Sequence, residues 1–394
     1  MSVEPAATPS AYVERVRVLA PVIAAEADQS ERDRRLTVPL MDALHEAGLF
    51  RLLLPRSLDG GEIDPATFTE VMEAVSRIDA STAWCLGQAA GCCMVAAYLD
   101  PEVAWDIFGR EPRAILAWGP GPTARAVATE GGYRISGTWS FASGGRHATW
   151  LGGYCPIWEG DGTPRRAAGG MQEGRTMLFP SRSATLIDVW NVIGLRGTGS
   201  DSYVVTDLFV PHAYTVARDT EAERRHSGLL YCFPSGSLYA SGFAGVALGL
   251  ARTTLDAFLE LARDKTPRGA RHTVRESATV QFQVAHAEAQ LSSARLFLMT
   301  SLREIWHDVG RARRLTLDQR GRIRLAATYA IHQAKEVVDT IYHAAGSSAI
   351  FQSGPFERRF RDIHAVTQQL QGRQAHFETV GRIMFGLEPD SSFL

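Results

Sequence analysis

The amino-acid sequence predicts an α+β fold that is mostly α, with a β-rich segment between two helical segments. The chain has 394 residues, of which 45% are hydrophobic and 21% charged, and this composition is typical of a globular protein. One core seldom grows large enough for such a length, so two or three subdomains are expected. Apolar residues recur at helical spacing near both ends of the chain, whereas its middle contains short β-rich runs.

The first helical segment extends from residue 10 to about residue 110. Within it, the pattern predicts a helix that begins after Thr37, carries Pro39 in its first turn and ends at Gly48. Proline is tolerated there because the first amide hydrogens of a helix have no intrahelical partner, and glycine suits the turn that ends a helix.

The middle segment extends from residue 114 to about residue 216. Gly, Pro, Asp and Ser separate its β-rich runs at hairpin-like intervals, which predicts a small antiparallel sheet or barrel. The runs are AILAW, YRISGTWSF, TWLGGY, TMLFP, ATLIDVW and SYVVTDLFV. GPGPTA, at 119–124, fits a dinucleotide-binding GxGxxA turn, but two prolines remove amide donors and the following RAVATEGGYRI reads as a strand pair. A Rossmann fold is therefore disfavoured.

The last segment begins near residue 237 and holds three long stretches of helical periodicity, each long enough for an antiparallel bundle. They are GVALGLARTTLDAFLELAR, ESATVQFQVAHAEAQLSSARLFLMTSLREIW and LDQRGRIRLAATYAIHQAKEVVDTIYHAAG. The chain order is therefore helices, sheet, helices.

Composition and missing motifs argue against several classes of function. The 41 basic residues are balanced by 43 acidic ones, so nucleic acid is not an expected partner. The sequence has no GxxxxGK[ST], GxSxG or HExxH motif and no histidine pair with metal-ligand spacing, so no metal is expected. The five cysteines lack CxxC spacing and no signal peptide or membrane span is evident. A cytoplasmic protein with reduced thiols is expected.

Three turns rich in Gly, Ser and aromatic residues are candidates for binding a flat ligand, because small residues allow a close approach of the backbone. They are GTWSFASGGRHATW at 137–150, GLRGTGSDS at 194–202 and AAGSSAIFQSGPFERRFRD at 344–362. Each one alone is equally consistent with an ordinary connection between strands or helices.

Together with GLFRLLLPRSLDGGEIDPATFTEVMEAVSRIDASTAW at 48–84, these motifs resemble the acyl-CoA dehydrogenase superfamily over nearly the whole chain. The resemblance implies an N-terminal helical domain at 1–113, a middle β-domain at 114–225 and a C-terminal four-helix bundle at 226–394. It also implies a flavin between the sheet and the bundle, and a homotetramer.

The dehydrogenases of this superfamily need a glutamate either after the RD of ERRFRD or early in the first bundle helix. This chain has IHAVTQQLQGRQ after Asp362 and Tyr239 near the second position, and a neutral amide cannot act as a general base. SFASGGRHATW and GLRGTGSDS are instead similar to the two-component flavin-dependent monooxygenases. The implied reaction hydroxylates an aromatic or heteroaromatic small molecule with O2 through a flavin C4a-hydroperoxide, using reduced FMN or FAD from a separate flavin reductase.

Two alternatives stay open from the sequence. One is a flavin dehydrogenase whose base is Asp362 or Glu357. The other is a non-catalytic binder of flavin or of another metabolite.

The resemblance also implies roles for particular residues. Phe141 would lie against the flavin ring, Ala142 would line the same turn and Ser143 would lie beside N5, where its hydroxyl can donate or accept a hydrogen bond. Arg271 would hold a flavin phosphate across a subunit boundary, with Arg268 and Arg275 as alternatives. The full set placed around the flavin is Trp84, Trp118, Gly119, Pro120, Phe141, Ala142, Ser143, Arg271, Gly346 and Ser347. Without the resemblance, Ser143 would end a strand, Trp84 would be a core aromatic and Gly346 would end a helix.

The oxygenases commonly carry a histidine seven residues after the aspartate of the RD motif, where this chain has Gln369. His364 and His376 lie near that position in the sequence. His364 shares a helix face with Gln368, so it is the nearer candidate for the catalytic base, although a solvated histidine is the simpler interpretation. An indole, an amine or an already activated ring would not need a strong base.

Overall fold

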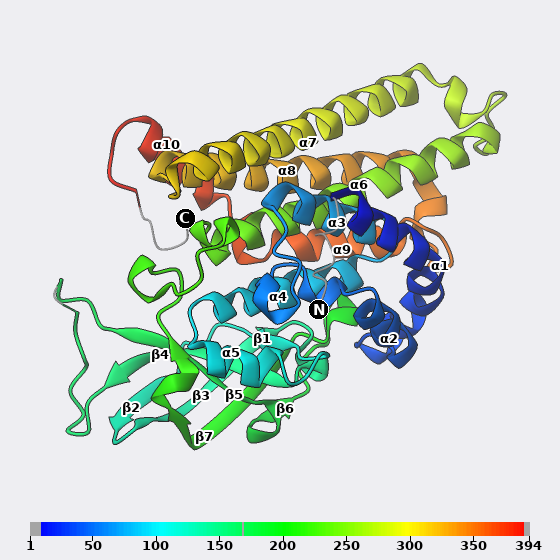
Figure 1. Ribbon diagram of the computed structural model, residues 1–394. Helices are drawn as coiled ribbons and strands as arrows, with labels where there is room; N and C mark the ends of the chain where they lie inside the picture. The colour runs from blue at the N-terminus through cyan, green and yellow to red at the C-terminus, as the bar shows by residue number, and fades with distance from the viewer. Residues whose placement is uncertain (1–8, 168, 390–394) are drawn as a thin grey trace.

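A computed structural model describes residues 9–167 and 169–389 (Figure 1). Five helices come first, then the strands, then five more helices, so the predicted α+β fold with mostly helical content is confirmed. The first five helices are α1 Pro9–Asp33, α2 Val38–Glu46, α3 Pro65–Ser76, α4 Ala80–Cys93 and α5 Pro101–Phe108. The last five are α6 Ser235–Asp264, α7 Ala278–Ala312, α8 Leu317–Ala345, α9 Glu357–Thr367 and α10 Ala375–Met384.

Capping side chains fix where the first helices begin. The carboxylate of Asp79 accepts a 2.7 Å hydrogen bond from the amide of Thr82 and so starts α4, the helix that carries Trp84. The predicted helix after Thr37 is present as α2, and Gly48 follows it with φ +69°. The side chain of Thr37, however, makes no capping hydrogen bond.

The strands form one eight-stranded sheet with the order β6-β7-β3-β2-β4-β5-β8, and β1 pairs with β4 off this path. The prediction of an antiparallel sheet is only partly right, because β4 pairs in parallel with both β1 and β2. The strands are β1 Leu116–Trp118, β2 Arg125–Thr129, β3 Gly132–Ala142, β4 Trp150–Trp158, β5 Gly174–Pro180, β6 Thr185–Ile187, β7 Asp201–Pro211 and β8 Thr215–Val216. Trp139 and Tyr203 stack at 5.4 Å in the core of the sheet.

The helices before and after the sheet share one hydrophobic core, while the sheet has a second core of its own. α3 lies directly against α6, where the hydroxyl of Ser76 donates a 2.6 Å hydrogen bond to the carbonyl of Val246. Glycines allow this close packing, since a Cβ at Gly245 would lie 2.6 Å from the carbonyl oxygen of Thr69. The first helical segment is therefore packed onto the bundle and not independent of it.

α6 is the central helix of this shared core. By length and composition it could cross a membrane, but 72% of its most apolar window is buried by the rest of the chain, as in the core helix of a soluble protein. α6 and α7 extend together away from the sheet in Figure 1, and the loop that joins them lies at the far end from the strands.

Candidate functional site

The predicted hairpin ends at Ser143, which lies directly after β3 and is only 6% exposed. The backbone turns sharply here. Phe141 has φ +61°, a conformation that costs energy in a residue with a Cβ, and the amide of Ser143 donates to the carbonyl of Phe141 at 2.9 Å. This turn directs the side chain of Ser143 inward while the ring of Phe141 stays 62% exposed.

Three segments that are distant in the sequence meet at the Ser143 hydroxyl. The indole Nε1 of Trp84, from α4, donates to Ser143 Oγ at 3.1 Å. Ser200, from the GLRGTGSDS motif, lies 2.6 Å from the same oxygen, and Thr198 Oγ1 lies 2.7 Å from Ser200 Oγ. Ser200 and Thr198 are each only 2% exposed. The structure thus brings the first helical segment, the hairpin and the second glycine-rich motif together at one oxygen atom.

Trp84 is part of an aromatic wall, so it is both a core residue and a contact of Ser143. Its ring stacks on Phe243 of α6 at 3.9 Å, and Phe243 stacks in turn on Tyr239 at 5.8 Å. Gly87 and Gly91 of α4 leave the space for these rings, since a Cβ at Gly91 would lie 2.3 Å from the ring of Tyr239.

The Trp118-Gly119-Pro120 turn lies against the end of β3. The amide of Ser140 donates to the carbonyl of Pro120 at 3.0 Å, and a Cβ at Gly119 would lie 1.7 Å from the carbonyl oxygen of Ser140. Only glycine fits in this position. Gln88 of α4 donates to the carbonyl of Trp118 at 3.2 Å, which connects this turn to the aromatic wall.

Two polar groups of the wall, Cys92 and Tyr239, are neutral at physiological pH, whereas the guanidinium of Arg218 lies 4.5 Å from the ring of Trp118. Burial raises the pKa of the Cys92 thiol to about 12, and Cys92 Sγ lies 3.3 Å from the Tyr239 hydroxyl. Burial also raises the pKa of Tyr239. A thiolate nucleophile is excluded at Cys92 by this shift, because the thiolate is the reactive form.

An exposed aromatic surface continues outward from the hairpin. The ring of Phe141 meets that of Trp190 edge-on at 6.1 Å, and the nearby Val189 and Ile193 are 51% and 67% exposed. Large apolar side chains that cluster at a surface mark a binding or assembly site. This apolar surface lies next to a buried hydroxyl and a turn that only glycine fits, so it is a candidate for binding an aromatic ring.

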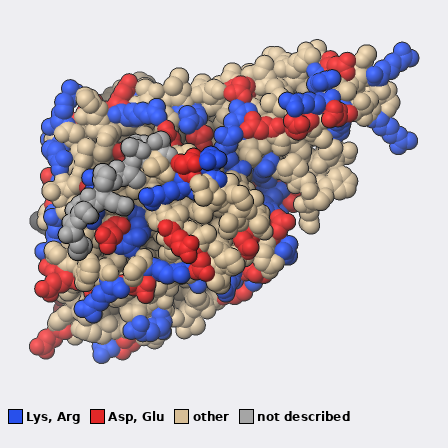
Figure 2. All heavy atoms as spheres, turned by 45° about the vertical axis from the view of Figure 1, so that its right-hand side comes forward, with Lys and Arg blue, Asp and Glu red and all other residues tan. Residues whose placement is uncertain are grey.

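Arg271, Gly346 and Ser347 lie elsewhere in the single chain. Arg271 is exposed in the loop between α6 and α7, whose tip shows Lys and Arg side chains in Figure 2, and Arg268 and Arg275 of that loop are exposed as well. Gly346 ends α8 with φ +57°, and the neighbouring Ser347 is exposed. One chain therefore does not bring these residues to Ser143.

The residues considered for the catalytic base each make contacts with groups other than Ser143. His364 Nε2 lies 2.9 Å from Asp339 Oδ1 of α8. His376 Nε2 contacts the carbonyl of Leu370 at 2.7 Å. Gln369 Oε1 accepts from the amide of Gln371 at 2.9 Å, while Gln369 Nε2 is buried and has no hydrogen-bond partner in the part of the chain that the structure describes.

The two carboxylates considered for a dehydrogenase are occupied by structural contacts. Asp362 is 3% exposed, and its Oδ1 accepts a 2.6 Å hydrogen bond from the amide of Leu195. Burial raises the pKa of Asp362 to about 7. Glu357 pairs with Arg361. Neither carboxylate is free to take a proton from a substrate at the Ser143 hydroxyl.

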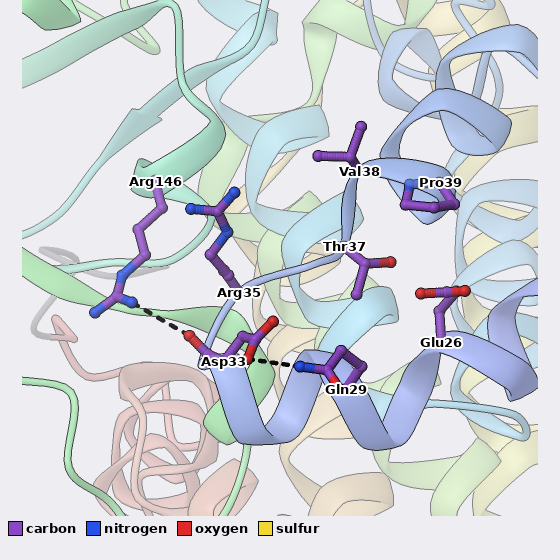
Figure 3. A pocket seen from close by; sticks show the side chains of 8 residues that line it. All are labelled: Glu26, Gln29, Asp33, Arg35, Thr37, Val38, Pro39 and Arg146. Carbon is purple, nitrogen blue, oxygen red and sulfur yellow. Dashed lines mark hydrogen bonds between the residues drawn. The ribbon is translucent and has the colours of Figure 1, made fainter.

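A hollow of about 620 Å³ lies beside this site, between α1, α2 and the residues after the hairpin (Figure 3). Its lining is strongly charged, and Arg146 crosses toward Asp33 while it also pairs with Asp201 at 2.5 Å. The lining residues are Glu26, Gln29, Asp33, Arg35, Thr37, Val38, Pro39 and Arg146. A hollow with charges of both signs suits a flat neutral ring less well than the aromatic wall does.

Sequence reasoning selected the GLRGTGSDS motif but missed the individual roles of Thr198 and Ser200, and it did not select Phe243 or Gln88. Thr198 and Ser200 lie on either side of Gly199, and this spacing of two hydroxyl residues could have indicated their roles. Phe243 is one of many apolar residues on α6, so nothing in the sequence distinguishes it. No group of three or more His, Cys, Asp or Glu is placed to hold a metal ion within the described residues.

Comparisons with known proteins identify the family of this chain. The N-terminal domain model of the acyl-CoA dehydrogenases matches residues 11–103, and the C-terminal domain model matches residues 241–372. An indole-3-acetate monooxygenase of Pseudomonas putida is 28% identical, over 92% of this chain and 91% of that protein. The oxygenase component of an FADH2-dependent resorcinol hydroxylase of Rhizobium is also 28% identical, over 97% of this chain and 95% of its own.

Among solved structures, XiaF from Streptomyces, in complex with FADH2 and glycerol, superimposes with a TM-score of 0.90 at 26% identity and covers 98% of each chain. The match is continuous through the helical, β and bundle segments. The chain therefore belongs to the acyl-CoA dehydrogenase superfamily and, within it, to the branch of two-component flavin-dependent monooxygenases.

Proposed function

We propose that this chain is the oxygenase component of a two-component system that hydroxylates a small, electron-rich aromatic or heteroaromatic molecule. One oxygen atom of O2 enters the product and the other leaves as water, with both electrons drawn from reduced FMN or FAD. The observation that carries the proposal is the buried Ser143 hydroxyl, held by Trp84 and Ser200 at the edge of an aromatic surface. The full-length similarity to named monooxygenases supports it.

The flavin supplies the activation of oxygen when it is bound, and this chain's residues hold it and keep water away. Ser143 would bind the N5 edge of the ring, Phe141 would lie against the ring, and the Gly119 turn would allow a close approach of the backbone. Trp84 and Trp118, which are 7% and 8% exposed, exclude water from this edge. A dry, hydrogen-bonded N5 edge favours transfer of oxygen to the substrate over release of hydrogen peroxide.

We assign the substrate to rings that react without prior deprotonation, such as an indole. Cys92 and Tyr239 of the aromatic wall stay protonated because burial raises their pKa values, and Gln369 occupies the position where related oxygenases commonly have histidine. The buried, unpartnered Nε2 of Gln369 would donate a hydrogen bond to the substrate, because leaving such a donor unpaired costs about 1–3 kcal/mol. His364, already held by Asp339, is the remaining ionisable candidate if a substrate does need a base.

We further propose that the enzyme works in the cytoplasm as a homotetramer, and that a separate reductase delivers the flavin by diffusion. Arg271 of a second copy would then reach the flavin phosphate, since in one chain Arg271 lies at the far end of the α6–α7 pair (Figure 1). A guanidinium binds phosphate through two parallel hydrogen bonds, which suits Arg271 to that role.

The test supplies purified protein with chemically reduced FMN or FAD, air and a panel of indoles and phenols, with catalase present to remove free peroxide. Formation of hydroxylated product in the presence of catalase is expected. Ser143→Ala should shift most of the consumed oxygen from product to peroxide. Because one hydrogen bond is lost, the ratio of peroxide to hydroxylated product should rise roughly 10-fold.

Ser202→Ala is the matched control, because Ser202 donates to Ser140 at 3.0 Å on the neighbouring strand and does not contact Ser143. It should leave the ratio unchanged. Release of all oxygen as peroxide by the wild-type protein, with every flavin and substrate in the panel, would refute the proposal.

A further inference from the structure

Trp84, Ser143, Ser200 and Thr198 form a series of hydrogen bonds. The atoms at its two ends, Trp84 Nε1 and Thr198 Oγ1, have fixed hydrogen-bonding roles. Trp84 Nε1 only donates, and it donates to Ser143 Oγ at 3.1 Å. At the other end, Thr198 Oγ1 lies 2.8 Å from the carbonyl oxygen of Leu195. A carbonyl oxygen only accepts, so the single hydroxyl hydrogen of Thr198 is used there.

These fixed ends determine every hydrogen between them. Since the hydrogen of Thr198 points to Leu195, the 2.7 Å contact between Thr198 and Ser200 requires Ser200 to donate. Since the hydrogen of Ser200 is then used, the 2.6 Å contact between Ser143 and Ser200 requires Ser143 to donate. Ser143 Oγ therefore accepts from Trp84, donates to Ser200 and retains only a lone pair for any further partner.

Burial makes this order costly to reverse. Ser143, Ser200 and Thr198 are 6%, 2% and 2% exposed. A hydroxyl that breaks its hydrogen bond in this series therefore leaves a desolvated polar group unpaired. Hydrogen bonds in a buried series also strengthen one another.

We infer that Thr198 and Ser200 are positioning residues that make Ser143 an acceptor only, so that the site selects reduced flavin over oxidised flavin. This inference rests on the proposed function, which puts Ser143 beside N5. In reduced flavin N5 carries a hydrogen and donates, which matches the free lone pair of Ser143. In oxidised flavin N5 only accepts, so two lone pairs face each other. An oxygenase supplied by a separate reductase gains from this selectivity, because oxidised flavin is released and reduced flavin is bound.

The experiment measures dissociation constants of oxidised and of anaerobically reduced FMN and FAD, for the full-length wild-type protein and three variants. In Ser200→Ala the hydrogen of Ser143 has no partner and can turn toward oxidised N5. Thr198→Val preserves the shape of the side chain but removes the acceptor of the Ser200 hydrogen. Ser200 can then donate to Ser143, and Ser143 can donate to a group in the site. Both variants should bind oxidised flavin about tenfold more tightly, while their affinity for reduced flavin stays the same. The ratio of the two dissociation constants therefore changes about tenfold.

The third variant, Ser200→Thr, retains a hydroxyl and should retain the wild-type selectivity. Ser202→Ala is again the matched control, since its hydroxyl lies outside the chain of hydrogen bonds. An unchanged ratio of the two dissociation constants in both Ser200→Ala and Thr198→Val would overturn the inference, as would a parallel loss of affinity for both flavin states. Failure of the wild-type protein to bind either state would instead overturn the proposed function.

Discussion

Gln369 replaces an ionisable side chain by a neutral amide at the start of the short 3-10 turn Leu370–Gly372. Its Oε1 accepts from the amide of Gln371 at 2.9 Å, and its Nε2 has no partner in the described part of the chain. Histidine fits the same contact, because a neutral imidazole accepts through one ring nitrogen and donates through the other.

Gln369→His should therefore extend the reaction to phenols and give it a pH dependence. An imidazole with an ordinary pKa near 6.5 accepts a phenolic proton only above that pH, so phenol hydroxylation should rise severalfold from pH 5.5 to 8. Indole hydroxylation should keep the pH profile of the wild-type protein. Product formed at each pH is measured for the wild-type protein and for Gln369→His. A rate of phenol hydroxylation equal to that of wild type across the range would contradict the role assigned to this position.

At the scale of elements, the GLRGTG segment is attached to α9 through a single buried carboxyl group. Asp362 accepts from the amide of Leu195, and a Cβ at Gly194 would lie 2.2 Å from the carbonyl oxygen of Arg361. This contact sets the position of Leu195, whose carbonyl fixes the hydrogen of Thr198. The RD motif would thus support the proposed flavin site by holding the backbone and not as a base.

This attachment should make stability depend on pH through Asp362. Burial raises the pKa of Asp362 to about 7 in the folded chain, whereas in the unfolded chain it has its ordinary value near 3.8. Between those values the folded chain binds a proton that the unfolded chain releases, so its stability falls as pH rises, by roughly 1.4 kcal/mol per pH unit, and levels off above about pH 7.

Asp362→Asn retains the acceptor for Leu195 and removes the titration. The free energy of unfolding in urea, measured from pH 5 to 8, should therefore fall for wild type relative to this variant up to about pH 7. Asp188→Asn is the control, since the hydrogen bond from Arg34 lowers the pKa of the exposed Asp188, so its carboxyl stays ionised in the folded and the unfolded chain and its difference from wild type should be constant over this range. A constant difference between wild type and Asp362→Asn over this range would show that the Asp362 carboxyl does not titrate.

The elements of this fold were predictable wherever a pattern persisted over many residues. The three long stretches of helical periodicity are α6, α7 and α8, and each β-rich run contains a strand. The parallel pairing of β4 with β1 and β2 was not predictable, because a strand's own side-chain pattern does not encode the direction of its neighbour. α9 is short and polar, so no long apolar periodicity predicted it.

The sequence selected part of the candidate site and none of its connections. Motif wording selected Trp84, Gly119 and Ser143, and the structure brings all three to the end of β3. The order of hydrogens through Ser200 and Thr198 depends on contacts of 2.6 to 2.8 Å, of which the one between Ser143 and Ser200 joins segments far apart in the sequence. Such an order becomes visible only in coordinates.

At the scale of the whole molecule, one chain would supply only part of the proposed site. The hairpin and the aromatic wall lie at the junction of the sheet and the helices, whereas the basic loop with Arg271 projects from the opposite end of α6 and α7 (Figure 1). Exposed apolar side chains on α7, including Phe282 and Leu296 at 69% and 66% exposure, would be covered by assembly.

If Arg271 acts on the site of another copy, two inactive variants should restore activity when they assemble together. In a mixed pair of Ser143→Ala and Arg271→Ala chains, one site lacks both groups, while the other combines an intact Ser143 with an intact Arg271. Co-refolded or co-expressed mixtures should therefore recover roughly a quarter of the coupled hydroxylation of wild type, from the statistics of random pairing. Each variant alone should give little product, and a mixture that gives only the sum of its two parts would show that Arg271 acts within its own chain or not at all.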